Sequence, residues 1–238
     1  MKIKVLHLFQ DLMNLYGDYG NVSILCKRLE EQGAEVQLDC RSIGDILFSD
    51  DYDFIYCGAG TEKKRDIALA ALKKEKEALK SAIESGRFVL FTGNSWEMLG
   101  RSIKSVDDEM LEGLGFFDYS TVETDTRITG DIIVESDFLS KPICGFVNKC
   151  GSVSGISTPL FKGIKLGPGN SESDKNEGFR YKNFMGTELI GPILVKNPQL
   201  LKMIMKKLLG DEYRDIEHAA AEKAYDVTLN ALLDRIKK

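Results

Sequence analysis

Cysteine and histidine are the side chains in this 238-residue chain best suited to act as nucleophile, base or soft metal ligand, and they are few. The chain has five cysteines and two histidines, His7 and His218. The cysteines are Cys26, Cys40, Cys57, Cys144 and Cys150. They form no CxxC pair and are odd in number, so we expect free thiols, with no zinc site, no disulfide framework and no bound metal or cofactor. Chemistry that needs several imidazoles is disfavoured.

The segment 88–100, FVLFTGNSWEMLG, places a glycine turn directly after a continuous apolar strand. This strand–turn–helix has the form of a nucleophile elbow, where the residue on the tight turn is exposed at the sheet edge. Amides at the start of the following helix can then stabilise an oxyanion. Taken alone the pattern is weak, because a glycine after a strand usually only makes a turn.

The first hundred residues alternate between strand and helix patterns. The predicted order is a strand at 3–9, a helix at 21–33, strands at 35–40 and 53–57, a helix at 62–86, a strand at 88–92 and a short helix through Leu99. This order is typical of a doubly wound parallel sheet in an α/β protein. Function is therefore expected at the carboxyl ends of the strands: after Phe9, in the loop 58–60 and at Gly93.

The second half of the chain changes character. The patterns predict antiparallel strands within 119–134 on either side of Thr129-Gly130, loop-rich segments at 148–158 and 167–178, a strand at 184–195, a helix from Asn197-Pro198 to Leu209, and a last helix at about 211–237. The last helix carries two adjacent apolar stripes. We expect them to pack on the protein's own core, with partner docking as the alternative. Without a repeat or linker, residues 1–238 are interpreted as one domain.

Composition narrows the classes of function. The chain is 43% hydrophobic and 29% charged, with a formal net charge of −5. These values are typical of a folded domain and argue against a nucleic-acid partner. The N-terminal apolar run is too short for a signal peptide, and no segment approaches a membrane span, so we expect a cytoplasmic protein.

Six segments in order resemble the class I glutamine amidotransferases of the cobyric acid synthase type. They are DLMNLYGDYGN (11–21), CGAGTEKKRD (57–66), FTGNSWEMLG (91–100), EGLGFFDYSTVETDTRITGDIIVESD (112–137), GPGNSESDKNEGFRYKN (167–183) and GTELIGPILVKNP (186–198). Within that family, the chain is most similar to the glutaminase (GatD-like) group of lipid II isoglutaminyl synthase subunits. The resemblance covers nearly the whole chain.

The resemblance implies a flavodoxin-like three-layer sandwich whose mostly parallel sheet has an antiparallel extension. It also implies hydrolysis of glutamine and transfer of the ammonia to a synthetase. In the GatD-like group that partner is a Mur-ligase-like subunit, which forms a heterodimer with the glutaminase and amidates the peptidoglycan precursor lipid II. An amidotransferase domain of the cobalamin pathway is the alternative, although such domains are commonly fused to a larger synthetase.

The family mechanism uses a cysteine on the elbow and a histidine that moves the proton. Laying residues 96–100 on the end of the family elbow ICGGYQxLG puts Gly93 at the nucleophile position. The family motif GTYLHGP reads GTELIGP at 186–192, which puts Ile190 at the position of the base. No catalytic residue is therefore intact, and losing either member of such a unit typically costs about 10⁴-fold in rate or more.

Two further motifs of the family are altered in this sequence, and one position associated with substrate binding is kept. The loop that usually reads GGGQD or GGGSD is here Gly58-Ala59-Gly60-Thr61-Glu62, and a stretch resembling NHGGRT is here NKCGSV at 148–153. Arg127 matches a family position associated with holding the substrate glutamine. The resemblance thus assigns Arg127, Gly58 and Gly60 to binding of glutamine or a related amino acid.

Three functions remain open. The first is a subunit without glutaminase activity that still docks a Mur-ligase-like partner, and the loss of both catalytic residues favours it. The second is a glutaminase or other amide hydrolase with a non-standard nucleophile, either Cys57 paired with His7 or a hydroxyl of Ser95 or Thr92. The third is a sensor that binds glutamine through Arg127.

Overall fold

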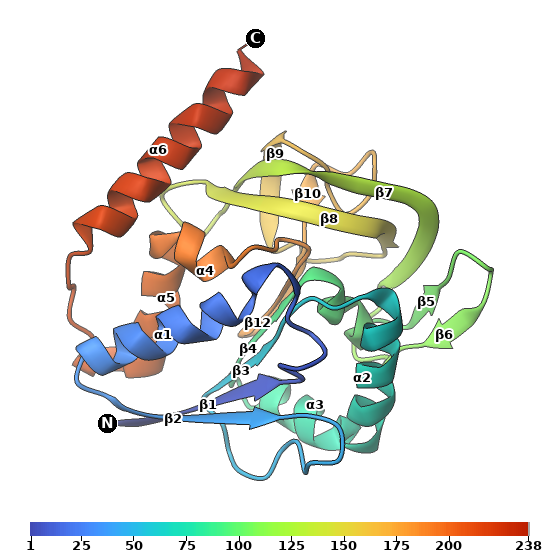
Figure 1. The fold of residues 1–238 in the computed structure, drawn as a ribbon, viewed down its shortest axis with the longest axis horizontal. Coiled ribbons are helices and arrows are strands. Elements are labelled where there is room, and N and C mark those ends of the chain that lie inside the picture. The colour runs from blue at the N-terminus through green and yellow to red at the C-terminus, as the bar shows by residue number, and fades with distance from the viewer. Residues whose placement is uncertain (238) are drawn as a thin grey trace.

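Two β-sheets organise the chain in the computed structural model, which describes residues 1–237 (Figure 1). The first sheet has the strand order β11-β12-β4-β3-β1-β2. Its strands are β1 (Lys2–Leu8), β2 (Glu35–Arg41), β3 (Phe54–Cys57), β4 (Phe88–Thr92), β11 (Phe179–Tyr181) and β12 (Phe184–Thr187). All neighbours pair in parallel except β11 and β12. The carboxyl ends of β3, β4 and β12 therefore meet at one edge.

Helices cover both faces of this sheet. Strands β3 and β4 are buried along their whole length, which explains why their sequences are continuous apolar runs. One face packs with α1 (Tyr19–Glu31) and α5 (Pro198–Leu209), and the other with α2 (Glu62–Lys74) and α3 (Lys76–Glu84). The predicted three-layer α/β class is confirmed.

The antiparallel extension takes the form of a second sheet. Its long strands are β7 (Ser120–Glu135) and β8 (Ile143–Ser154), which pair antiparallel over most of their length. The shorter strands are β5 (Ser102–Lys104), β6 (Met110–Glu112), β9 (Phe161–Leu166) and β10 (Asn176–Glu177). Apolar side chains of β7 and β8 join the core cluster on the α1 and α5 face. The second sheet is thus fixed against the first.

The predicted helix at 62–86 is wrong in one respect, because it divides at Glu75. Glu75 leaves helical geometry, and its carboxylate accepts hydrogen bonds from the backbone N–H groups of Leu47 (2.8 Å) and Phe48 (3.1 Å). The charged side chain ties the loop after β2 to the α2–α3 junction.

Three predictions in the second half are corrected. Strand β7 continues through Thr129-Gly130, which pairs with β8 instead of forming a turn. Residues 148–154 belong to β8 and are not a loop; their burial alternates along the strand. The apolar run at 184–195 is a strand only to Thr187, and the short helix α4 (Ile193–Lys196) follows. The secondary structure of these segments depends on contacts with residues that are distant in the sequence.

The C-terminal helix is shorter than predicted and extends away from the body (Figure 1). Helix α5 begins at Pro198 as expected, but residues 213–218 are not helical and α6 spans Ala219–Ile236. Tyr225 and Leu232 are buried against the second sheet, whereas Val227 is 61% exposed. One predicted stripe therefore packs on the core and the other faces solvent.

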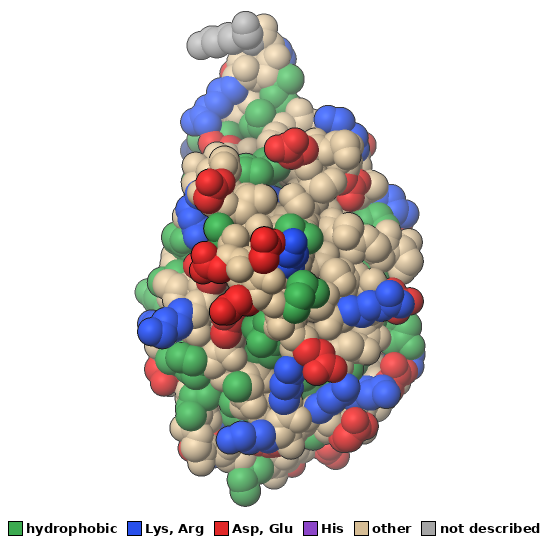
Figure 2. Space-filling view, turned by 90° about the vertical axis from the view of Figure 1, so that its right-hand side faces the viewer, with side chains coloured by type: hydrophobic (Ala, Val, Ile, Leu, Met, Phe, Trp, Pro, Cys, Tyr) green, Lys and Arg blue, Asp and Glu red, His purple; other side chains and the backbone are tan. Residues whose placement is uncertain are grey.

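The surface carries charges of both signs. Basic and acidic side chains are interspersed with apolar ones on the face shown in Figure 2. Within residues 1–237, no helix has both the length and the apolar character needed to cross a bilayer.

Candidate functional site

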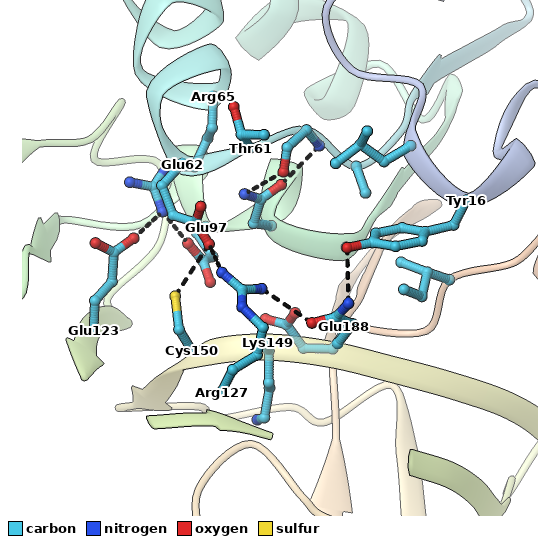
Figure 3. A pocket seen from close by; sticks show the side chains of 17 residues that line it. Tyr16, Thr61, Glu62, Arg65, Glu97, Glu123, Arg127, Lys149, Cys150 and Glu188 are labelled. Atoms are coloured by element: carbon cyan, nitrogen blue, oxygen red, sulfur yellow. Dashed lines mark hydrogen bonds and ion pairs between the residues drawn. The ribbon is translucent and has the colours of Figure 1, made fainter. Parts of the chain in front are cut away.

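A cavity of about 240 Å³ lies at the carboxyl edge of the first sheet (Figure 3). Residues that follow β1, β3 and β4 form one side of it, and residues of β7 and β8 form the other. Tyr16, Gly60 and Gly93 line it from the three strand ends that the sequence predicted. The second sheet thus completes a site that the parallel sheet begins.

Gly93 occupies the turn of the elbow. It directly follows β4, begins the short 3-10 helix Gly93–Leu99 and has a φ of +59°. This left-handed conformation costs glycine little but strains other residues. A Cβ atom at position 93 would lie 3.1 Å from Cγ2 of Ile190. Gly93 and Ile190 therefore face each other in the cavity, and their assignment to the family's nucleophile and base positions stays a prediction.

Asp18 joins the loops that surround the elbow. Its carboxylate accepts hydrogen bonds from the N–H of Ala59 (2.8 Å), the hydroxyl of Thr92 (3.2 Å) and the N–H of Gly191 (3.3 Å). Burial raises the pKa of Asp18 to about 6, while these donors act in the opposite direction. Asp18 thereby fixes the ends of β3, β4 and β12 relative to one another.

Arg127 reaches the cavity from β7 but is already engaged by the chain itself. Its Nη2 donates to Oε1 of Glu62 (2.6 Å), and its Nη1 donates to Oδ1 of Asn148 (3.0 Å). The amide of Asn148 donates in turn to the hydroxyl of Tyr16 (2.8 Å). This chain of bonds crosses the cavity from α2 to the β1–α1 loop (Figure 3). A ligand carboxylate would have to compete with Glu62 for the guanidinium.

Cys150 places a thiol in the cavity that the sequence analysis counted only as a free cysteine. Its Sγ donates to Oε1 of Glu62 at 3.2 Å. Burial and the Glu62 carboxylate raise the pKa of Cys150 to about 12. The group is therefore a thiol at neutral pH, and the thiolate is the reactive form.

Buried charges form the base of the cavity. Arg65 donates to Glu97 (2.7 Å) and Glu123 (2.6 Å), and Glu188 accepts a hydrogen bond from the indole of Trp96 (3.1 Å). Burial and the nearby Glu188 raise the pKa of Glu97, while the ion pair with Arg65 acts in the opposite direction. Arg65 thus offsets part of the cost of burying several carboxyl groups together.

Gly58 and Gly60 are required by close packing. A Cβ on Gly58 would lie 2.5 Å from the carbonyl oxygen of Met13, and one on Gly60 would lie 2.3 Å from the sulfur of the same residue. Gly60 lines the cavity, whereas Gly58 lies behind it. Their assignment to substrate binding stays a prediction.

The structure does not bring together Cys57 and His7, the pair considered as an alternative nucleophile and base. The ring of His7 packs against that of Tyr56 (5.2 Å between centroids), and Tyr56 belongs to the core on the α1 face. Cys57 follows Tyr56 along β3 and belongs to the core on the opposite face. Burial lowers the pKa of His7 to about 4 and raises the pKa of Cys57. The two side chains cannot meet across the sheet.

The hydroxyl groups of Ser95 and Thr92, on the elbow, also form hydrogen bonds within the protein. Ser95 Oγ lies 2.8 Å from the carbonyl oxygen of Thr92 and 3.0 Å from that of Cys57. The Thr92 hydroxyl contacts Asp18 and the hydroxyl of Tyr56. Both residues are fully buried, and neither lines the cavity. Among residues 1–237, no group of three or more His, Cys, Asp or Glu side chains is placed to hold a metal ion.

The fold is that of a class I glutamine amidotransferase. A glutamine amidotransferase from Thermotoga maritima superposes with a TM-score of 0.55 at 16% identity, covering 98% of this chain and 97% of the other. A second structure described as a glutamine amidotransferase gives a TM-score of 0.58 at 13% identity, covering 86% and 98% of the two chains.

The chain belongs to the family of CobB/CobQ-like glutamine amidotransferase domains, whose model matches residues 4–198. It is 33% identical over 243 residues to the GatD subunit of lipid II isoglutaminyl synthase (glutamine-hydrolyzing) from Staphylococcus aureus strain N315, covering 100% of this chain and 97% of that protein. It is 31% identical over 225 residues to the GatD subunit of Streptococcus pneumoniae strain ATCC BAA-255 / R6, covering 93% and 86%. The resemblance predicted from the motifs is confirmed.

Proposed function

We propose that this chain is a glutamine amidotransferase-like subunit that does not hydrolyse glutamine and that takes part in the amidation of lipid II. Two relatives matched over most of their length are named as subunits of lipid II isoglutaminyl synthase, which supports the pathway. The cobalamin pathway is the weaker alternative, because it rests on the breadth of the family description alone.

One observation supports the absence of hydrolysis: Gly93 and Ile190, which the resemblance assigns to the nucleophile and base positions, face each other in the cavity. Hydrolysis would require attack of a nucleophile on the side-chain carboxamide, cleavage of the C–N bond and donation of a proton to the departing ammonia. Glycine supplies no nucleophile, and isoleucine moves no proton. His7 and His218 both lie outside the cavity lining.

The partner that fits this proposal is a Mur-ligase-like synthetase bound as a heterodimer. Such a synthetase would use ammonia from solution if its amidotransferase-like subunit releases none. The chain would then act by docking, stabilising or regulating the synthetase.

Glutamate release from glutamine tests this proposal. The purified chain, alone and with its Mur-ligase-like partner, should release glutamate no faster than a matched sample without protein. Turnover that a point substitution in this chain abolishes would contradict the proposal.

Cys150 carries the second candidate function, an amide hydrolase with a non-standard nucleophile. Its thiol lies in the same cavity as Arg127 and contacts a carboxylate, Glu62, that could accept its proton. Against this stands the raised pKa of Cys150, which leaves little thiolate at neutral pH.

A substitution pair separates the two candidates. If Cys150 were the nucleophile, Cys150→Ser would remove glutamate release and Cys57→Ser would not, because Cys57 is fully buried outside the cavity. Our proposal expects no turnover above background in the parent or in either variant.

A further inference from the structure

The loop after β3 presses against the elbow at Ala59. A Cβ atom at position 93 would lie 2.4 Å from Cβ of Ala59 and 3.2 Å from its Cα. Non-bonded carbon atoms prefer separations of about 3.5–4.0 Å. The space that the first atom of any side chain at position 93 would need is therefore already filled by the methyl group of Ala59.

Ala59 blocks this space more firmly than Ile190 does. The contact with Cγ2 of Ile190, at 3.1 Å, would require a shift of only a few tenths of an ångström, whereas the 2.4 Å contact with the methyl group of Ala59 is much closer. The methyl group of Ala59 is attached directly to the backbone and moves only with it.

The backbone at Ala59 is held in place from several sides. Its N–H donates to the buried carboxylate of Asp18 (2.8 Å), and its carbonyl accepts from the N–H of Leu15 (2.9 Å). The flanking Gly58 and Gly60 pack against Met13: an added Cβ would lie 2.5 Å from its carbonyl oxygen at position 58 and 2.3 Å from its sulfur at position 60. These bonds and contacts hold the loop beside the elbow.

We propose that Ala59 is a third disabling position: its methyl group restricts position 93 to glycine, so restoring cysteine and histidine at positions 93 and 190 does not rebuild the elbow. This inference rests on the proposed function, since it explains why the site stays closed to its family's chemistry. Only the combination with Ala59→Gly makes space for a nucleophile.

A double-mutant cycle on thermal stability tests the contact directly. The four proteins are the parent, Gly93→Ala, Ala59→Gly and the double variant; alanine adds only the Cβ atom in question. The left-handed backbone and the contacts with Ile190 Cγ2 and with Cα of residue 59 penalise Gly93→Ala in both backgrounds, but the 2.4 Å overlap with the methyl group exists only with Ala59 present. Gly93→Ala should lower Tm by at least about 3 °C more in the parent than in the Ala59→Gly background.

Gly115→Ala is the matched control. Gly115 has a φ of +64°, close to that of Gly93, and a Cβ there would meet no atom within 4 Å. Its substitution adds the same kind of backbone strain without an overlap, so Ala59→Gly should leave its effect on Tm unchanged.

Each result of the double-mutant cycle either supports or overturns the role of Ala59. An equal fall of Tm in both backgrounds overturns the assignment of Ala59, as does failure of both Gly93→Ala and the double variant to fold. Folding of the double variant where Gly93→Ala alone fails supports it most strongly. Glutamate release by the parent chain would contradict the proposed function but leave this coupling intact.

Discussion

Arg65 lines the cavity but has a structural role, because it pairs with buried carboxyl groups of the protein. Its side chain is 3% exposed, and its guanidinium donates to two buried carboxyl groups, Glu97 and Glu123. Such a cluster is stable only while every member has a partner, because an unpaired buried charge is costly. The base of the cavity is therefore rigid.

Replacing Arg65 by methionine should strongly destabilise the chain. The substitution keeps the apolar stem but leaves Glu97 and Glu123 without their donor, and we expect a loss of about 3 kcal/mol in the free energy of unfolding. Urea unfolding at pH 7 measures it. Arg101→Met removes the exposed partner of Asp118 and should leave the urea midpoint close to that of the parent. Equal effects of the two substitutions would contradict the account.

Glu177 should make stability depend on pH. Its carboxyl group accepts from the N–H of Glu188 (2.7 Å) and the hydroxyl of Thr187 (2.8 Å), and burial raises its pKa from 4.5 to about 8. Between these two values the folded chain keeps a proton that the unfolded chain releases. Stability from this group is therefore full below pH 4.5 and falls as the pH rises towards 8.

Comparison with Glu177→Gln isolates that contribution. The free energy of unfolding of the parent, relative to that of Glu177→Gln, should fall by about 1 kcal/mol per pH unit between pH 5 and 8. Urea unfolding at four pH values measures it, with Glu172→Gln as the control for an exposed position. A difference that stays constant across the range would refute the assignment.

The residues of the site were predictable only in part. Motif comparison located Gly93, Ile190 and Arg127, because each lies within a recognisable segment. The overlap between Ala59 and a side chain at position 93 depends on how closely two loops approach, because an added Cβ would lie 2.4 Å from that of Ala59, and no spacing in the sequence reveals this. Glu188 did leave a signal in the sequence, because it is a charged residue inside the apolar run 184–195.

Among the elements, the junction of α2 and α3 shows why a helical pattern overstates helix length. Glu75 continues the charged, amphipathic repeat of 62–86, so the sequence offers no reason for a break. Its carboxylate instead binds two backbone N–H groups of a loop more than twenty-five residues earlier. Contacts of this range override local propensity.

Glu75→Ala should loosen that loop. Loss of two hydrogen bonds to a carboxylate leaves the N–H groups of Leu47 and Phe48 unpaired, and we expect a cost of about 1–3 kcal/mol in the free energy of unfolding. Hydrogen exchange at these two amides should accelerate. Glu77→Ala, at an exposed position of α3, should leave their exchange unchanged. Unchanged exchange in Glu75→Ala would contradict this role.

At the scale of the whole molecule, local patterns predicted the parallel sheet, whereas for the second sheet they indicated only antiparallel strands within 119–134 and the resemblance implied an antiparallel extension. The strands of the parallel sheet are short apolar runs between helices, so each is visible locally. Strands β7 and β8 are defined by pairing with each other, and glycine within them suggested turns and loops. Because Arg127, Asn148 and Cys150 lie on these strands, the cavity itself could not be built from local patterns.

The molecule has the scaffold of an amidotransferase around its cavity. The scaffold is held by Asp18, by the Arg65 cluster and by the bonds of Arg127, each of which spans several elements. Our proposal that this cavity lacks a nucleophile and a base leaves the shape of the molecule intact, as a docking or regulatory role requires.

The source of nitrogen in the amidated product tests the central claim most directly. The chain and its Mur-ligase-like partner would be supplied with lipid II, ATP and either glutamine labelled with nitrogen-15 in the side-chain amide or labelled ammonium. Mass spectrometry of the product reports the transferred atom. We predict amidation with label from ammonium and none from glutamine. Transfer of label from glutamine at a rate that depends on this chain would contradict the account.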